Sequence, residues 1–163
     1  QVIEKIALSN SPGSIISKEL ALEHLFNQSD YSLFELVDAC LLGHADKAIQ
    51  IVRQASSNKS EATLVLWMLT QETRILIQLL YLIQQKIDFK TACSQLKIWP
   101  QKANMYQIAI KRFNNTLLQQ ALLYCKCIDE QIKSSLNSQV WNSLEKLALS
   151  LSLGNTSGAP CIV

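Results

Sequence analysis

The chain has 163 residues and a formal net charge of +2, with 48% hydrophobic and 17% charged residues. This composition excludes an intrinsically disordered chain, because it supplies enough apolar surface for a core. The small net charge gives no argument for nucleic-acid binding by itself, since DNA-binding domains concentrate basic residues on one surface. The length suits one domain with a fragment of a neighbour. No signal peptide is visible. Because the chain lacks an initiator Met and starts inside an amphipathic pattern, we interpret it as a piece of a longer protein.

The five cysteines have no spacing typical of a disulfide framework or a metal site. Cys125 and Cys127 are two residues apart in a helical pattern, where their side chains diverge. We therefore expect reduced, mostly buried thiols in a cytosolic protein, with no metal and no cofactor. The most apolar window, residues 64–83, contains two charged residues and two glutamines. This argues against a membrane span.

The first 28 residues form a separate part of the pattern. A short apolar stripe over residues 2–7 stops at the Pro12–Gly13 turn, and Ser17 is a candidate N-cap for a helix to about Phe26. The polar residues 27–30 then interrupt the pattern. We place a domain boundary there and divide the chain into a piece of one domain over 1–28, a helical domain over 29–153 and a tail over 154–163.

The helical domain is expected to open with a pair of helices. Ser32 and Glu35 have the spacing of a capping box, and Gly43 suits a helix C-terminus. A second helix follows over 46–55. Residues 60–86 give the longest helical pattern, with one narrow polar stripe and apolar residues around most of the circumference. Such a helix is packed by neighbours on several sides, so it is predicted to be the central buried helix.

Four more helices are predicted after residue 86. Asp88 is placed to cap a short helix, and Pro100 suits the first turn of a helix to about Phe113. Thr116 and Gln119 form a second capping box, for a helix to about residue 134. The last helix begins at residue 137 or 138. The fold class is therefore all-α, a multi-helix bundle of roughly eight helices.

Few residues suggest chemistry. Glu35 and Asp38 share one helix edge, whereas catalytic carboxylate pairs face a cleft from two elements. Asp38 has apolar neighbours, and its burial without a partner would cost about 1–3 kcal/mol. We therefore expect a helix N-terminus or a basic residue beside it, with Arg74 as one candidate. Glu72 and Arg74 belong either to a solvated stripe or to a subunit contact, since Arg is favoured at interfaces.

Two segments are candidates for contact with DNA. Trp99 is followed by Pro100 and, three residues on, by Lys102, so the indole could stack on a base while the lysine meets a phosphate. Alternatively, Trp99 closes the core over the preceding helix. Lys111 and Arg112 form a short basic pair that is either a second DNA contact or ordinary surface.

Five segments carry a resemblance to a known family. In chain order they are FELVDACLLGHADKAIQIV (34–52), LVLWMLTQETRILIQLLYLI (64–83), LKIWPQKANMYQIAIKRF (96–113), TLLQQALLYCKCIDEQIKSS (116–135) and VWNSLEKLALSLS (140–152). Their order and amino-acid sequences resemble the C-terminal half of the delta subunit of bacterial DNA polymerase III, the clamp-loader subunit that opens the sliding clamp. No single segment is specific, and the succession of all five supports the resemblance.

The resemblance implies that residues 1–28 end the small helical lid of an AAA+-like module. The domain over 29–153 would be a collar that joins the matching domains of the gamma/tau and delta-prime subunits in a five-membered ring. Phe34, Asp38 and Gly43 would form the lid–collar junction. Trp99 matches an aromatic of related chains near primer–template DNA, which the domain would contact weakly or indirectly. Leu136 departs from relatives that carry an aromatic there, which puts a second stacking contact in doubt.

Activity and location follow from the same resemblance. Clamp binding in this family belongs to the N-terminal domain, which lies outside the sequence, and the chain has no Walker sequence. We therefore expect a non-catalytic part of a DNA polymerase holoenzyme, in the cytoplasm at the nucleoid-associated replisome and without membrane contact. Two alternatives remain, namely a stand-alone helical adaptor that binds a peptide or small ligand, and the collar of a gamma or delta-prime subunit, although residues 37–43 fit delta better.

Overall fold

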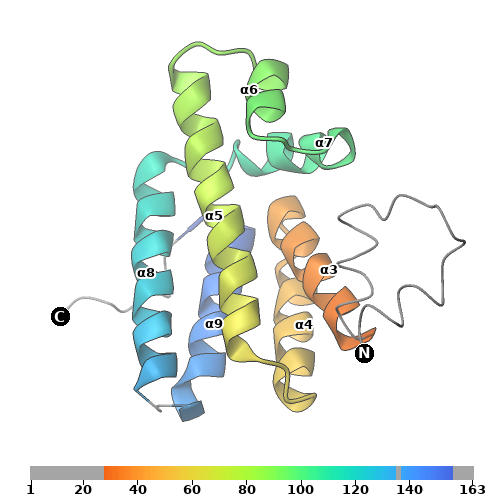
Figure 1. The fold of residues 1–163 in the computed structure, drawn as a ribbon, viewed down its shortest axis with the longest axis vertical. Helices are drawn as coiled ribbons and strands as arrows, with labels where there is room; N and C mark the ends of the chain where they lie inside the picture. The colour runs from red at the N-terminus through yellow and green to blue at the C-terminus, as the bar shows by residue number, and fades with distance from the viewer. Residues whose placement is uncertain (1–27, 135–136, 156–163) are drawn as a thin grey trace, which may run out of the picture.

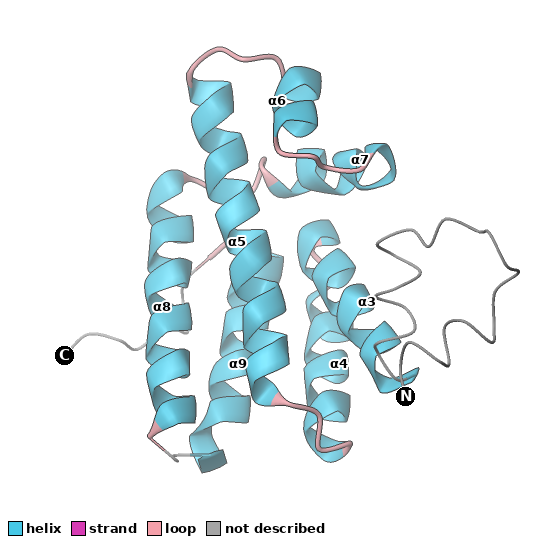
Figure 2. Ribbon diagram, in the orientation of Figure 1, coloured by secondary structure: helices cyan, strands magenta, loops and turns pink. Residues whose placement is uncertain are grey.

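The computed structural model describes residues 28–134 and 137–155. Their fold is all-helical and contains no strand (Figure 2). The seven helices are α3 (Gln28–Leu42), α4 (Ala45–Ser57), α5 (Ala62–Gln84), α6 (Phe89–Gln95), α7 (Pro100–Ala109), α8 (Asn115–Lys133) and α9 (Asn137–Leu153). This confirms the predicted fold class. The helices predicted before residue 27, and the tail beyond residue 155, lie outside the described residues.

Helices α4, α5, α8 and α9 lie side by side (Figure 1). Helix α3 packs against α4 and α9, and α6 and α7 lie at one end of α5. The helix α5 packs against α3, α6, α8 and α9, as expected for the predicted central helix. It shares the central position with α9, which packs against α3, α4, α5 and α8. None of the described helices combines the length and the apolar run needed to cross a bilayer.

Several predicted helix boundaries are confirmed. Gly43 ends α3 with a φ of +84°, in the left-handed region that favours glycine. The N–H of His44 donates to the Ala39 carbonyl, as in a Schellman motif. Asp88 caps α6 by accepting hydrogen bonds from the backbone N–H groups of Lys90 and Thr91. Pro100 occupies the first turn of α7.

Both predicted capping boxes are wrong. The helix α3 begins at Gln28, so Ser32 lies inside it and three of the four residues of the supposed polar break are helical. The helix α8 is capped by Asn114, whose side-chain oxygen accepts from the N–H of Leu117, and Thr116 is an interior residue. Polar residues that match a capping pattern also occur in the first turns of longer helices, which the pattern alone does not distinguish.

The apolar faces were predicted more accurately than the ends. On α9 helical spacing predicts an inward face that is buried except for the partly buried Trp141; its other members are Val140, Leu144, Leu147, Ala148 and Leu151. On α4 the apolar spacing predicts a face of Ala48, Ile49, Val52 and Ala55. The structure buries Ile51 in place of Ile49. The helix α7 stops at Ala109, four residues before the predicted end at Phe113. This early stop places Arg112 in a turn, where its side chain acquires the contact described below.

Candidate functional site

Asp38 of α3 and Lys102 of α7 form an ion pair, with 3.1 Å between Oδ1 and Nζ. Each side chain is about one third exposed. The expectation of a basic residue beside Asp38 is therefore confirmed, but the suggested partner, Arg74, is wrong. The two helices also pack against one another, so the ion pair and the packing together hold α7 on α3.

Glu72 of α5 lies at the same junction and accepts a hydrogen bond from the hydroxyl of Tyr106 on α7. Burial raises the pKa of Glu72, while the bond from Tyr106 and the charge of Lys102 oppose the rise. Tyr106 is 3% exposed. Glu72 therefore faces the junction between α5 and α7 and does not belong to the exposed polar stripe. We call Asp38, Lys102, Glu72 and Tyr106 the polar junction.

Trp99 is the N-cap residue of α7 and its side chain is 53% exposed. It therefore does not close the core, which was the alternative to a DNA contact. The indole lines a hollow between α6 and α7, with the apolar residues Phe89 and Ile98 and with the lysines Lys90 and Lys97. An exposed aromatic ring between lysines suits a nucleobase and its phosphates. We call this hollow the Trp99 site.

Lys90 and Lys97 were not singled out from the sequence. A usable signal existed, since three exposed lysines lie within or beside the short α6, at positions 86, 90 and 97. Lys97 stands at a positive φ of +54° in the connection to Trp99. Lys90 and Lys97 come together with Trp99 because of the conformation of the α6–α7 connection. The sequence pattern predicted the position of this connection but not its conformation.

Lys111 is exposed, whereas its neighbour Arg112 is partly buried against the end of α3. The Arg112 Nη2 donates to the carbonyls of Cys40 at 3.0 Å and Leu41 at 2.8 Å. These carbonyls belong to the last turn of α3, where such groups lack helical partners. Burial lowers the pKa of Arg112. Arg112 was a candidate DNA contact, but its guanidinium forms hydrogen bonds within the domain.

The predicted junction residues of α3 have distinct positions. Gly43 faces the guanidinium of Arg112, and an added Cβ would lie 3.3 Å from the Arg112 Cζ. Phe34 is 38% exposed. Glu35 pairs with Lys47 of α4, with 2.9 Å between Oε2 and Nζ. The candidate catalytic pair of Glu35 and Asp38 is therefore divided between two separate ion pairs.

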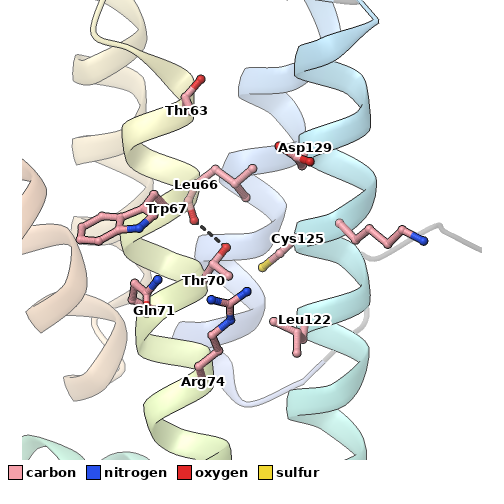
Figure 3. Close-up of a pocket in the computed structure, with 10 residues that line it drawn as sticks. Thr63, Leu66, Trp67, Thr70, Gln71, Arg74, Leu122, Cys125 and Asp129 are labelled. Atoms are coloured by element: carbon pink, nitrogen blue, oxygen red, sulfur yellow. Dashed lines mark hydrogen bonds between the residues drawn. The ribbon is translucent and has the colours of Figure 1, made fainter.

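A groove runs between α5 and α8 (Figure 3). Arg74 and Thr70 extend from α5 toward Cys125 and Leu122 of α8, and Trp67 lines the groove at its edge away from α8. Arg74 forms no ion pair or side-chain hydrogen bond with any other residue in the parts of the chain that the structure describes. Of the two predicted interface candidates, Arg74 is therefore the exposed one.

No group of three or more His, Cys, Asp and Glu side chains within 28–134 and 137–155 is arranged to hold a metal ion. Burial raises the pKa of the Cys40 thiol to about 12. Cys93 and Cys125 are also buried and free, and Cys127 is partly buried and free. Three of the four described cysteines are thus buried, in line with the expectation of mostly buried thiols.

Comparison with known proteins identifies the family. A family profile described as the C-terminal domain of the DNA polymerase III delta subunit matches residues 30–147. The DNA polymerase III subunit delta of Escherichia coli is 24% identical over 151 residues, which are 93% of this chain and 43% of that protein. The subunit of Haemophilus influenzae is 25% identical over 134 residues, 77% of this chain and 39% of that protein.

The matched range coincides with the helical bundle from α3 to the middle of α9. The chain spans about two fifths of the length of these relatives. It belongs to the family of DNA polymerase III delta subunits and covers their C-terminal domain.

Proposed function

We propose that residues 29–153 form the non-catalytic assembly domain of a clamp-loader delta subunit. In this proposal the domain joins the matching domains of the gamma/tau and delta-prime subunits in a collar ring. The family match over residues 30–147 is the observation that carries the proposal. The exposed aromatic and apolar side chains of α5 and α8 support it, because Trp67, Tyr81 and Leu123 are each more than half exposed.

The lid–collar junction would lie at the start of α3. Residues 1–28 would end the lid of an AAA+-like module, and α3 would connect the lid to the helical bundle. Asp38 supports this role because it ties α3 to α7 through Lys102. Gly43 supports it because it permits the tight reversal from α3 into α4. Phe34 remains a candidate contact to the lid because of its partial exposure.

Primer–template DNA would approach the Trp99 site. Trp99 would stack on a base, while Lys90 and Lys97 would lie close to phosphates. Lys102 is a weaker candidate, since it is paired with Asp38. Lys111 remains an additional candidate because it is exposed. Arg112 is a weaker candidate, since its Nη2 is already bonded to two carbonyls of α3. With so few cations the contact would add to DNA affinity without dominating it.

Contact with the sliding clamp would belong to the part of the subunit outside this chain. The parent subunit would act in the cytoplasm at the replisome, as one component of a DNA polymerase holoenzyme.

The proposal is tested with the full-length subunit and a variant that lacks residues 29–153. Each is immobilised and offered purified gamma and delta-prime subunits. We expect the full-length subunit to retain both partners and the shortened variant to lose them while it still binds the sliding clamp. Retention of gamma and delta-prime by the shortened variant would overturn the assembly role.

A further inference from the structure

Five residues of α5 follow one another at spacings of four and three along the exposed side of the helix. They are Trp67, Gln71, Arg74, Gln78 and Tyr81, and we call them the α5 stripe. Trp67 and Tyr81 are each 57% exposed, and Arg74 and Gln78 are exposed as well. The alternation of four and three is the spacing by which one helix presents a continuous seam to another.

The composition of the α5 stripe is that of a protein interface. Trp, Tyr and Arg dominate the binding energy of protein–protein contacts. Trp67 and Tyr81 mark the two ends, and Arg74 lies midway between them. At 1.5 Å per residue the ends are about 21 Å apart, which is the length of about four helical turns. A single partner helix is sufficient to cover this distance.

The helix α8 supplies a wall beside the α5 stripe. Along the half of the stripe from Trp67 to Arg74, the groove of Figure 3 is bounded by Leu122 and Cys125 of α8. At the other end a second hollow joins Gln78 and Tyr81 to Asn115 and Gln119 of α8. The α5–α8 surface is thus hollowed near both ends of the stripe, as required for a helix lying in a groove.

The charges of this surface specify the partner. The nearby carboxylates of α8 are already used, Asp129 by Lys133 and Glu130 by Lys126. Arg74 is the cation of the α5 stripe and has no ion pair among the described residues. Covering it without an opposite charge would carry a desolvation cost. One cation between paired charges is also too little for a DNA backbone, which needs a concentrated basic surface.

We propose that the α5 stripe and the adjoining face of α8 bind one amphipathic helix from another clamp-loader subunit. The partner helix places apolar side chains against Trp67 and Tyr81 and an Asp or Glu opposite Arg74. This inference rests on the proposed function and deepens it, because it assigns the face of the domain used in assembly and the chemistry of its partner.

The test measures the affinity of the full-length subunit for gamma and delta-prime in the absence of DNA. Arg74→Glu and Tyr81→Ser should each weaken binding roughly tenfold or more, as substitutions at interface hot spots do. Arg74→Gln, which removes the charge without reversing it, should have a smaller effect. Lys59→Glu is the matched control, because it makes the same charge reversal at an exposed loop position outside the stripe.

A photo-cross-linker at Gln78 identifies the occupant. We expect a cross-link to a helix of gamma or delta-prime that contains an Asp or Glu, and reversal of that residue to Arg should restore the affinity lost in Arg74→Glu. Cross-links to DNA, or to a second copy of the same subunit, would overturn the proposal.

Failure of this inference is distinguishable from failure of the proposed function. Normal affinity of Arg74→Glu and Tyr81→Ser would reject the α5 stripe as the contact. If deletion of residues 29–153 still abolished assembly, the domain would retain its assembly role through another face. If that deletion left assembly unchanged, both proposals would be rejected.

Discussion

Arg112 connects three parts of the domain at the scale of a single residue. Its Nη2 bonds to two carbonyls at the end of α3, and its main chain lies against Gly154, just beyond α9. The sequence presented it only as half of a basic pair with Lys111. Its role could not be read from the pattern, because it depends on the stop of α7 at Ala109 and on the meeting of elements far apart in the chain.

Arg112→Met is expected to lower the free energy of unfolding by about 1.5–3 kcal/mol, the usual worth of hydrogen bonds to a charged group. The variant removes both bonds and leaves two carbonyls of α3 without their side-chain donor. Urea unfolding followed by circular dichroism measures the change. The control is Lys111→Met at the exposed neighbouring position, expected to lie within about 0.5 kcal/mol of the parent. Equal losses in the two variants would contradict the internal role of Arg112.

Trp99→Ala is expected to weaken binding of the assembled loader to primer–template DNA by about fivefold to a hundredfold, the range for loss of one base–aromatic stack. Because the indole is 53% exposed, the unfolding temperature should change little. Leu153→Ala, at a residue that is 48% exposed at the end of α9, serves as the comparison and should leave DNA binding unchanged. Loss of thermal stability with normal DNA binding would place Trp99 in a structural role.

At the scale of helices, glycines at the ends of α3 and α9 allow both ends to pack closely against Arg112. Gly43 and Gly154 both have positive φ, at +84° and +67°. A Cβ on Gly154 would lie 2.7 Å from the Arg112 carbonyl oxygen, whereas the closest contacts at Gly43 would be 3.3 Å. Gly43 was recognised as a helix stop from the sequence. Gly154 was assigned to a tail, because nothing local to it shows that the turn beyond α9 packs on a distant segment.

Gly154→Ala should therefore destabilise the domain more than Gly43→Ala. Each variant pays about 1–2 kcal/mol for a left-handed backbone with a Cβ, and only Gly154→Ala adds a clash with main-chain atoms. Urea midpoints of the two variants and of Gln50→Ala, an exposed helical control, give the ranking. A Gly154→Ala protein as stable as the parent would show that the α9 end does not close on Arg112.

The polar junction sets the position of α7, and its buried carboxylate makes stability depend on pH. Burial raises the pKa of Glu72 above its ordinary value of 4.5. At a pH between the ordinary and the raised pKa, the carboxyl is therefore protonated in the folded state and ionised in the unfolded state. The contribution of Glu72 to the free energy of unfolding therefore falls as pH rises from the ordinary to the raised pKa. Glu72→Gln removes this titration and keeps an acceptor for Tyr106.

Relative to the parent, Glu72→Gln should gain stability as pH rises from 4.5, the ordinary pKa of a glutamate, to the raised pKa of Glu72 in the folded domain. Urea unfolding of both proteins across this range measures the difference in free energy of unfolding. A difference that stays constant with pH would mean that Glu72 ionises normally in the folded domain.

The helices were more predictable than their contacts. Long apolar patterns such as those of α5 and α9 identify helices and their buried faces, because helical periodicity is local. The pairing of Asp38 was only partly predictable. Its need for a cation followed from its apolar neighbours, but the choice of Lys102 over Arg74 depends on how α7 crosses α3. Likewise, Glu72 and Arg74 are two residues apart and consequently face different surroundings, one the polar junction and the other solvent.

At the scale of the whole molecule, the described helices separate three surfaces. The polar junction holds α7 on α3 and α5, the Trp99 site lies between α6 and α7, and the α5 stripe lies along the α5–α8 face. The polar junction shares α7 with the Trp99 site and α5 with the α5 stripe, but the residues that define the three surfaces are different. Substitutions on one surface should therefore leave the other two functions largely intact.

Light scattering after size exclusion tests the assembly role most directly. The full-length subunit is mixed with gamma and delta-prime, and its variant without residues 29–153 is mixed in the same way. We predict that the full-length protein enters one mixed oligomer with the mass of a five-subunit ring, and that the variant elutes apart from its partners. A variant that enters the same oligomer, or a full-length protein that stays outside it, would contradict the assignment of this domain to clamp-loader assembly.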